Sequence, residues 1–286
     1  MAGDQIIAIS EDDDTIAVTE DPAASLNEDL IVGKRPDTAI KPEKTLILGW
    51  NENAGQIIAE LDNYVPRDSL LTVVAEKVNM DDFQKITDHA ANLTINLIIG
   101  DPRDRGILDD QMAKNYDHVI ILSSQKELGI QESDANTLFI LLQLRDIAER
   151  TGYRFSVVSE MLDFRNKKLA EVTKVNDFIV SEKLISLMMS QIAENKMLNG
   201  IFEDLFDADG SELYIKKAAD YVAQNEAATF YHYIEAGRRR NEVVIGYVIE
   251  ADQKDADKNY GIHINPPKSE AILLCEQDGL IVISED

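Results

Sequence analysis

A glycine, an asparagine and an alanine occupy the key positions of a turn whose chemistry is phosphate binding. In TLILGWNENAG, the positions of a G-x-G-x-x-G/A motif hold Gly49, Asn51 and Ala54. The second glycine of that motif normally lets the backbone approach a pyrophosphate, because glycine has no Cβ atom. Glu76 follows 22 residues after Ala54, near the distance at which an acidic residue reads ribose hydroxyls. These residues predict a Rossmann-type scaffold in which Asn51 obstructs the pyrophosphate position.

Two more polar residues follow apolar runs that have the composition of buried strands. Asp101 comes after INLIIG, and Ser123 comes after HVIIL. Ligands of open parallel sheets bind at the carboxyl ends of the strands. We therefore expect a nucleotide cleft lined by Gly49, Asn51, Glu76, Asp101 and Ser123. A crevice that has lost its nucleotide is an equally good interpretation, because of Asn51.

Clustered carboxylates predict a second kind of site. Asp101 and Asp104 stand close to Asp109 and Asp110, and another acidic run covers residues 12–14. Ca²⁺ takes six to eight oxygen ligands, so such clusters are necessary for a calcium site without being sufficient. We expect a cation, most plausibly Ca²⁺, rather than NAD, with Asp101 and Asp104 among its ligands. The simpler alternative is a solvated acidic surface.

The basic residues and the single cysteine have structural interpretations. Arg103 and Arg105 are expected to pair with neighbouring aspartates rather than to hold a phosphate. The run Arg238–Arg240 lies between two expected strands and is interpreted as a hairpin loop. Cys275 is the single cysteine of the sequence, so no intramolecular disulfide can form, which fits a reducing compartment. It stands in an apolar pattern that predicts a position in the core.

Catalysis has little support in the sequence. The four histidines show no metal-ligand spacing, and the chain contains neither a G-x-S-x-G elbow nor a G-x-x-x-x-G-K-[ST] loop. We expect no enzyme. An NAD-dependent oxidoreductase and a scaffold that senses no ligand are the alternatives.

The chain is strongly acidic. Its 286 residues include 53 Asp and Glu against 28 Lys and Arg, and the formal net charge is −25. Such a surface repels nucleic-acid phosphates and anionic lipid headgroups, and it attracts cations and basic partners. A role in solubility alone is the simpler interpretation. No apolar run reaches the roughly 18 residues that a membrane span needs. We expect no nucleic-acid partner and no direct membrane insertion by this chain.

Regular alternation of strand and helix patterns predicts an α/β fold with a doubly wound, mainly parallel sheet over 44–180. Expected strands cover 45–49, 70–75, 94–99, 118–122, 154–158 and 177–180. Expected helices cover 52–63, 79–90, 104–113, 132–149 and 161–170. A linking helix is expected within 181–206, and its broad apolar surface predicts burial against another subunit or within its own chain.

The remaining segments predict a smaller lobe and an N-terminal extension. Residues 207–286 contain the β-like stretches ELYIKK, ATFYHYIEAG, EVVIGYVIEA, AILLCE and GLIVISED, which predict a β-rich C-terminal lobe. Residues 3–12 resemble 277–286, so we interpret 1–20 as the terminal strand of a preceding copy of the same domain. The acidic segment 21–43 is predicted to be a linker that is extended or disordered in part.

Several passages together resemble the regulator-of-K⁺-conductance (RCK) domains and Trk-type potassium-uptake regulators, and especially the CASTOR/POLLUX family of ion channels. They are LILGW followed by AELDNYVPRDSLLTVVAE, INLIIGDPRDRGILDD, YDHVIILSS with SDANTLFILLQLRDIAE, and FEDLFDADGSELYIKKAADYV with DGLIVISED. The resemblance covers nearly the whole chain, and its strength lies in the order and spacing of the passages.

The resemblance implies a cytosolic gating-ring domain of a cation channel or potassium transport system, responding to a bound cation or nucleotide. RCK-type domains assemble in pairs and rings under a membrane pore. The implied partners are therefore further copies of the chain and the transmembrane pore of a parent protein. The implied location is cytoplasmic, as the soluble part of a membrane protein.

Overall fold

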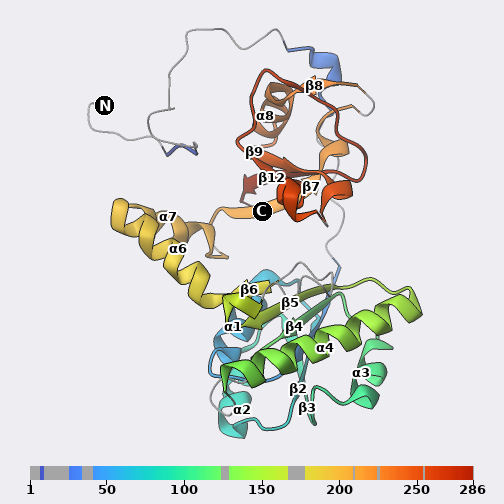
Figure 1. The fold of residues 1–286 in the computed structure, drawn as a ribbon. Coiled ribbons are helices and arrows are strands. Elements are labelled where there is room, and N and C mark those ends of the chain that lie inside the picture. The colour runs from blue at the N-terminus through green and yellow to red at the C-terminus, as the bar shows by residue number, and fades with distance from the viewer. Residues whose placement is uncertain are drawn as a thin grey trace. The chain divides into compact units, whose positions relative to one another are not determined.

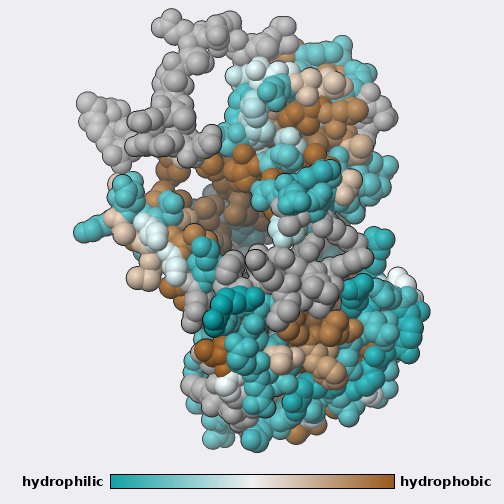
Figure 2. All heavy atoms as spheres, viewed as in Figure 1, coloured by the Kyte–Doolittle hydropathy of each residue, from teal (hydrophilic) through white to brown (hydrophobic). Residues whose placement is uncertain are grey.

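The computed structural model describes residues 7–9, 26–33, 41–123, 129–166, 178–208, 210–223, 226–253 and 255–285 (Figure 1). The chain forms two compact units. One comprises Thr38–Asn199, and the other comprises Gly200–Asp286 together with Met1–Asp37. Hydrophilic residues cover most of the visible face of the first unit, in keeping with the acidic composition (Figure 2).

The first unit contains a six-stranded sheet in the order β3-β2-β1-β4-β5-β6, with every neighbouring pair parallel. The strands are β1 (Lys44–Leu48), β2 (Ser69–Ala75), β3 (Leu93–Ile99), β4 (His118–Ile121), β5 (Ser156–Met161) and β6 (Phe178–Val180). The order reverses between β1 and β4, which is the switch point where open α/β sheets bind ligands. The predicted parallel Rossmann-like sheet is confirmed.

Helices cover both faces of this sheet. They are α1 (Ala54–Tyr64), α2 (Met80–His89), α3 (Arg105–Met112) and α4 (Ile130–Thr151). Leu46 and Leu48 of β1 pack with residues of α3 and α4, whereas Ile47 packs with residues of α1 and α2. Alternate residues of β1 therefore enter two separate cores, which is why Leu46, Ile47 and Leu48 are apolar in succession.

The prediction of a helix over 161–170 is wrong in its described part. β5 runs past the expected strand end, and a 3₁₀ turn covers Phe164–Asn166. Asp134 of α4 is buried, and its carboxylate accepts the amide N–H of Leu162 at 2.8 Å. This long-range bond fixes the turn after β5. Residues 167–170 lie outside the described part of the chain.

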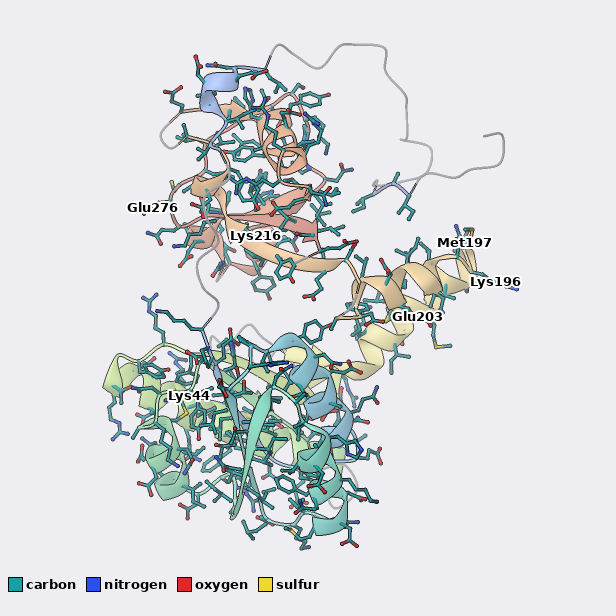
Figure 3. The ribbon with its side chains drawn as sticks, turned by 180° about the vertical axis from the view of Figure 1, so that it is seen from behind. Lys44, Lys196, Met197, Glu203, Lys216 and Glu276 are labelled. Atoms are coloured by element: carbon teal, nitrogen blue, oxygen red, sulfur yellow. The ribbon has the colours of Figure 1, made fainter. Side chains whose placement is uncertain are left out.

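The linking helix expected over 181–206 is two helices, α6 (Ser181–Glu194) and α7 (Leu198–Leu205). Oδ1 of Asn195 accepts the amide N–H of Met197 at 3.0 Å, so a side chain replaces the helical bonding between them. Lys196 and Met197 lie at the resulting turn (Figure 3).

Helix α6 carries apolar side chains on its surface. Their exposed fractions lie between 47% and 66% for Leu184, Ile185, Leu187 and Met189. Such a run has no covering partner among the described residues. Burial against another subunit therefore stays the prediction for this helix.

The C-terminal lobe is built on an antiparallel sheet in the order β10-β9-β12-β7 and a two-stranded ribbon of β11 and β8. The strands are β7 (Glu212–Lys217), β8 (Ala228–Thr229), β9 (Val243–Val248), β10 (Ile262–Ile264), β11 (Ala271–Ile272) and β12 (Gly279–Ser284). Short 3₁₀ segments cover Ala218–Asp220, Glu250–Asp252 and Ala256–Gly261. The predicted smaller β-rich lobe is confirmed.

One stretch of this lobe, ATFYHYIEAG, is not mainly β as predicted. After the short strand β8 it forms helix α8 (Phe230–Arg238). A reciprocal capping box joins Thr229 and His232 at its start. Its buried residues recur at three- and four-residue intervals, and they are Phe230, Tyr233, Ala236 and Gly237 among others. Burial on one helical face outweighs the strand preference of the aromatic residues.

Two further interpretations in this lobe are wrong. Arg238 ends α8 and Arg239 follows it, and both donate to the Glu235 carboxylate at 2.7–2.9 Å, so Arg238–Arg240 is no hairpin loop. The guanidinium carbon of Arg240 stands 4.1 Å from the ring centre of Tyr221. Cys275 is exposed rather than part of the core, because β11 ends before it.

Part of the expected linker is bound to the C-terminal lobe. Residues 26–33, here called the N-terminal strap, contain a 3₁₀ turn at Glu28–Leu30. Leu30 is buried in the core of the lobe, and Ile31 forms an antiparallel bridge with Val222. The strap, which falls within the segment 21–43 predicted to be a linker, therefore packs on the C-terminal lobe. For the strand expected near 3–10, only residues 7–9 are described, and they carry no strand assignment.

Candidate functional site

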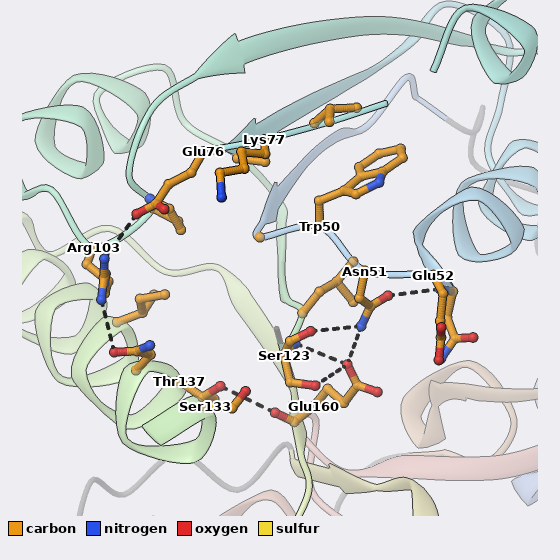
Figure 4. Close-up of a pocket in the computed structure, with 18 of the residues that line it drawn as sticks. Trp50, Asn51, Glu52, Glu76, Lys77, Arg103, Ser123, Ser133, Thr137 and Glu160 are labelled. Atoms are coloured by element: carbon orange, nitrogen blue, oxygen red, sulfur yellow. Dashed lines mark hydrogen bonds and ion pairs between the residues drawn. The ribbon is translucent and has the colours of Figure 1, made fainter. Parts of the chain in front are cut away.

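A cleft of about 670 Å³ lies at the carboxyl ends of the parallel strands (Figure 4). The residues around it come from the first turn, the ends of β2, β4 and β5, the loop after β3, and α4. They are Gly49, Trp50, Asn51, Glu52, Asn53, Ala75, Glu76, Lys77, Val78, Asn79, Pro102, Arg103, Leu122, Ser123, Glu132, Ser133, Asn136, Thr137, Ile140 and Glu160. The sheet topology thus places Gly49, Asn51, Glu76 and Ser123 around one cavity, as the sequence predicts.

Gly49 begins the turn from β1 to α1 in a conformation that requires glycine. Its φ angle is +101°, and a Cβ atom there would stand 2.5 Å from the carbonyl oxygen of Leu122. Its amide N–H donates to Val74 at 2.9 Å. The first glycine therefore brings the β1 turn into contact with the end of β4.

Asn51 fills the position of the second glycine with a bonded side chain. Its Nδ2 donates to the carbonyl oxygen of Ser123 at 3.0 Å and to Oε2 of Glu160 at 2.8 Å. Its Oδ1 accepts the amide N–H of Asn53 at 3.0 Å. The side chain joins the ends of β1, β4 and β5, and it uses one amide at the entry to α1 that would otherwise face a ligand.

Glu160 is the cleft residue that sequence reasoning missed. Its Oε2 accepts the amide N–H of Ser123 at 3.0 Å and the Ser123 hydroxyl at 2.9 Å, besides the Asn51 amide. We expected the strand to end at residue 158, which placed Glu160 in a loop. A strand two or three residues longer would have placed it at the carboxyl end of the sheet, where ligand-binding side chains lie.

On the opposite side of the cleft, an ion-paired arginine holds two acidic residues. Arg103 Nη2 lies 3.0 Å from Oε1 of Glu76, and Arg103 Nε lies 2.8 Å from Oδ1 of Asp101. Hydrogen bonds from Arg103 lower the pKa of the Asp101 carboxyl. Nη1 of Arg103 also contacts Asn136 at 3.3 Å. The predicted pairing of Arg103 with a neighbouring aspartate is confirmed.

The proposed cation ligands lie in two different settings. Both carboxylate oxygens of Asp101 accept from Arg103, whereas Oδ1 of Asp104 accepts the amide N–H of Ile107 and caps α3. Arg105 pairs with Asp109 at 3.1 Å, as predicted. Among the described residues, no group of three or more His, Cys, Asp or Glu side chains is placed to hold a metal ion. A cation at Asp101 and Asp104 stays a prediction, and it has to compete with Arg103.

The described lining of the cleft carries polar, charged and aromatic groups. It contains carboxylates, amides, hydroxyls, two basic side chains and one indole, with no histidine or cysteine among them.

None of the helices in the described ranges combines the length and the apolar character that crossing a membrane demands.

Known proteins resemble this chain in sequence and fold. A search of protein-family models found no match. The probable ion channel POLLUX of Arabidopsis thaliana is 30% identical over 86% of the chain and 34% of that protein. The probable ion channel CASTOR of Oryza sativa subsp. japonica is 29% identical over 99% of the chain and 35% of that protein. The chain thus spans about a third of the length of these relatives.

The fold of the chain is found in a solved gating ring. The human SLO3 gating ring superposes with a TM-score of 0.56 at 12% identity, over 85% of the chain and 44% of that structure. At this identity the likeness concerns the fold alone. The chain is similar in sequence to the CASTOR and POLLUX ion channels over most of its own length, and it shares its fold with a solved gating ring.

Proposed function

We propose that the chain is a regulatory domain of the gating-ring type, on the cytoplasmic side of a cation channel or potassium transport system. The observation that carries the proposal is the similarity to proteins named ion channels over 86% of the chain. The fold shared with a gating ring supports the same role. Because the chain spans about a third of its relatives, conduction is assigned to a transmembrane pore outside the matched region.

The cleft offers a route by which ligand binding changes the domain. Asn51, Ser123 and Glu160 join the ends of three strands, and α6 begins directly after β6, the strand beside β5. A ligand that binds one arrangement of this end of the sheet better than another shifts the population between them. A shift at β5 and β6 reaches α6, whose exposed apolar side chains are the expected contact with a second copy.

The regulating ligand is proposed to be a cation, Ca²⁺ in particular, at Asp101 and Asp104. The net charge of −25 concentrates cations around the domain, and carboxylate oxygens suit Ca²⁺. NAD in the cleft, near Gly49, Asn51, Glu76, Asp101 and Ser123, is the alternative ligand. The filled second-glycine position argues against it.

Ligand binding is tested by thermal denaturation of the chain with Ca²⁺, Mg²⁺, K⁺, NAD(H) and ATP, since a ligand of the folded state raises the melting temperature. Millimolar Ca²⁺ is expected to stabilise the chain beyond an ionic-strength control. Asp101→Asn and Asp104→Asn should remove the shift, and Asn at position 104 still caps α3. Asp81→Asn, at an exposed position on α2, is the matched control. Stabilisation by micromolar NAD, with none from Ca²⁺, would reverse the ranking.

The regulatory role is tested in a channel. The matching third of the Lotus japonicus ion channel CASTOR is replaced by this chain, and single-channel currents are recorded in planar bilayers. We expect currents whose open probability depends on the ligand that stabilises the chain. A chimera that reaches the bilayer and conducts without any ligand dependence supports the scaffold alternative. Hydride transfer from NADH to a panel of carbonyl substrates would support the oxidoreductase alternative.

A further inference from the structure

A carboxylate is fixed inside the cleft at the place where a dinucleotide fold holds its phosphates. Glu160 Oε2 receives three hydrogen bonds, from the Asn51 amide and from the amide and hydroxyl of Ser123, at 2.8–3.0 Å. Figure 4 shows the three side chains converging at the β1, β4 and β5 ends of the cleft. We call them the Glu160 cluster. Three donors hold one oxygen, so the negative charge has a fixed position.

The Glu160 cluster blocks the pyrophosphate subsite both through the position of the Asn51 side chain and through the charge of the Glu160 carboxylate. In a Rossmann site the phosphates rest on the first turn and on the start of α1, bound by backbone amides. Here the amide of Asn53 already donates to Asn51 Oδ1, and the Asn51 side chain stands over the turn. A phosphate placed beside the cluster would also meet the Glu160 carboxylate. Like charges in contact at a dry interface strongly disfavour binding.

The other half of the cleft retains what a nucleoside needs. Glu76 stands at the end of β2, where the fold reads ribose hydroxyls, and Arg103 orients its carboxylate. Val78 and Ile140 add apolar lining for a base. The basic residues of the lining, Lys77 and Arg103, lie beside Glu76 in Figure 4, away from Glu160. The Glu76 end of the cleft therefore carries the ribose-reading carboxylate and the basic side chains, whereas the Glu160 cluster stands at the phosphate end.

We propose that the cleft binds a nucleoside without a phosphate, neutral or cationic at its 5′ end, and that the Glu160 cluster excludes nucleotides. A ribose bound at Glu76 directs its 5′ carbon toward the first turn, so the 5′ substituent meets Glu160. A hydroxyl or a sulfonium group is compatible with a carboxylate there, whereas a phosphate is not. This assignment rests on the proposed function, because it names the ligand class of the cleft in the proposed regulatory domain, in addition to the cation proposed at Asp101 and Asp104.

The test is isothermal titration calorimetry of the full chain with adenosine, S-adenosylmethionine, AMP, ADP and NAD. The unchanged chain is expected to bind adenosine or S-adenosylmethionine, with no detectable heat from ADP or NAD. Glu160→Gln removes the charge with little change in shape and should strengthen ADP binding at least about tenfold relative to adenosine. Asn51→Gly, which reopens the turn, should do the same for NAD. Glu60→Gln, an exposed carboxylate of α1 outside the lining of the cleft, is the matched control and should change neither ratio.

Folding is checked separately, by the melting temperature and circular dichroism of each variant, and Glu76→Gln supplies a second readout. That variant keeps the Glu160 cluster and should lose nucleoside binding. Binding of ADP or NAD by the unchanged chain more tightly than adenosine overturns the proposal, as does the absence of any nucleoside binding. An unaltered ADP-to-adenosine ratio in a folded Glu160→Gln variant overturns it too. Channel chimeras that conduct without ligand dependence contradict the proposed function while leaving these binding ratios intact.

Discussion

The amide N–H of Asn27 donates to Nε2 of His232, 205 residues later in the chain, over 3.2 Å. In the same strap, Glu28 pairs with Arg239 at 3.2 Å, and Leu30 enters the core of the C-terminal lobe. The strap is therefore an integral part of that lobe.

Shortening the buried strap residue should weaken the lobe. Leu30→Ala is expected to lower the free energy of unfolding of the C-terminal lobe by about 2–4 kcal/mol, through lost burial and a residual cavity. Hydrogen exchange of the amides of Val32 and Ala223, which bond across the strap contact, is the measurement. The single tryptophan, Trp50, lies in the other unit, so its fluorescence serves as an internal control. Asp29→Asn, at an exposed strap position, should leave exchange unchanged, and equal protection in both variants would contradict the prediction.

An arginine pair makes the stability of this lobe depend on pH. Hydrogen bonds from Arg238 and Arg239 lower the pKa of Glu235 from 4.5 to about 2. A carboxyl group whose pKa is lower in the folded than in the unfolded state stabilises the fold at pH values above its unfolded-state pKa. This contribution is lost as the pH falls from about 4.5 to about 2. Glu235→Gln should therefore melt below the unchanged chain near neutral pH, and the difference should vanish near pH 2. Glu276→Gln, at another exposed position of the lobe, is the control. A melting difference that is constant with pH would rule this linkage out.

Replacing Gly49, the first glycine of the motif, should lower the free energy of unfolding more than replacing Gly152. Gly49→Ala is expected to destabilise the parallel-sheet unit by about 1–3 kcal/mol or more, because it adds a strained φ and a contact with the Leu122 carbonyl. Gly152→Ala is a matched control, since Gly152 also has a positive φ of +71° but has nothing within 4 Å of the added Cβ. Urea denaturation followed by Trp50 fluorescence measures both. Equal losses would show that the contact with Leu122 adds nothing to the cost of the backbone conformation.

The apolar surface of α6 should control assembly. We expect the chain to form a dimer or a larger ring, and Leu187→Glu combined with Ile185→Glu should shift it toward the monomer, because charged groups are costly in an apolar contact. Multi-angle light scattering over a concentration series is the measurement. Lys183→Glu, also on the exposed surface of α6, should assemble like the unchanged chain. A monomer at every concentration in the unchanged chain would count against the prediction.

The parallel sheet is the part of the fold that local sequence predicts best. Strands buried on both faces are rich in apolar residues, so runs such as LIL and HVIIL locate β1 and β4, whereas the edge strand β3 has exposed residues at Thr94, Asn96 and Ile99. The position of the cleft follows from these strands, because side chains that come directly after parallel strands lie together at the carboxyl end of the sheet. Gly49, Asn51, Glu76 and Ser123 were predictable for this reason, whereas Asp101 pairs with Arg103 beside the lining rather than within it.

Segments whose conformation depends on distant contacts were predicted less well. FYHYIEAGR has aromatic residues that favour strands, yet burial of one face against the C-terminal sheet makes it α8. The strap looks like part of an acidic linker until Leu30 is placed in the core. The turn after β5 depends on Asp134 of α4, which no local pattern connects to it.

The sequence by itself determined the α/β alternation, the two-unit division of strand patterns and the altered phosphate-binding turn at Asn51. Each of these depends on residues that are neighbours in the chain, through periodicity, chain stiffness or the absence of a Cβ atom. The tertiary structure decided what Asn51 does, because its partner Glu160 is 109 residues away. It likewise decided where the strap binds. Such pairs are selected by the geometry of the packed sheet and lobe, which fixes distances between residues that the sequence leaves independent.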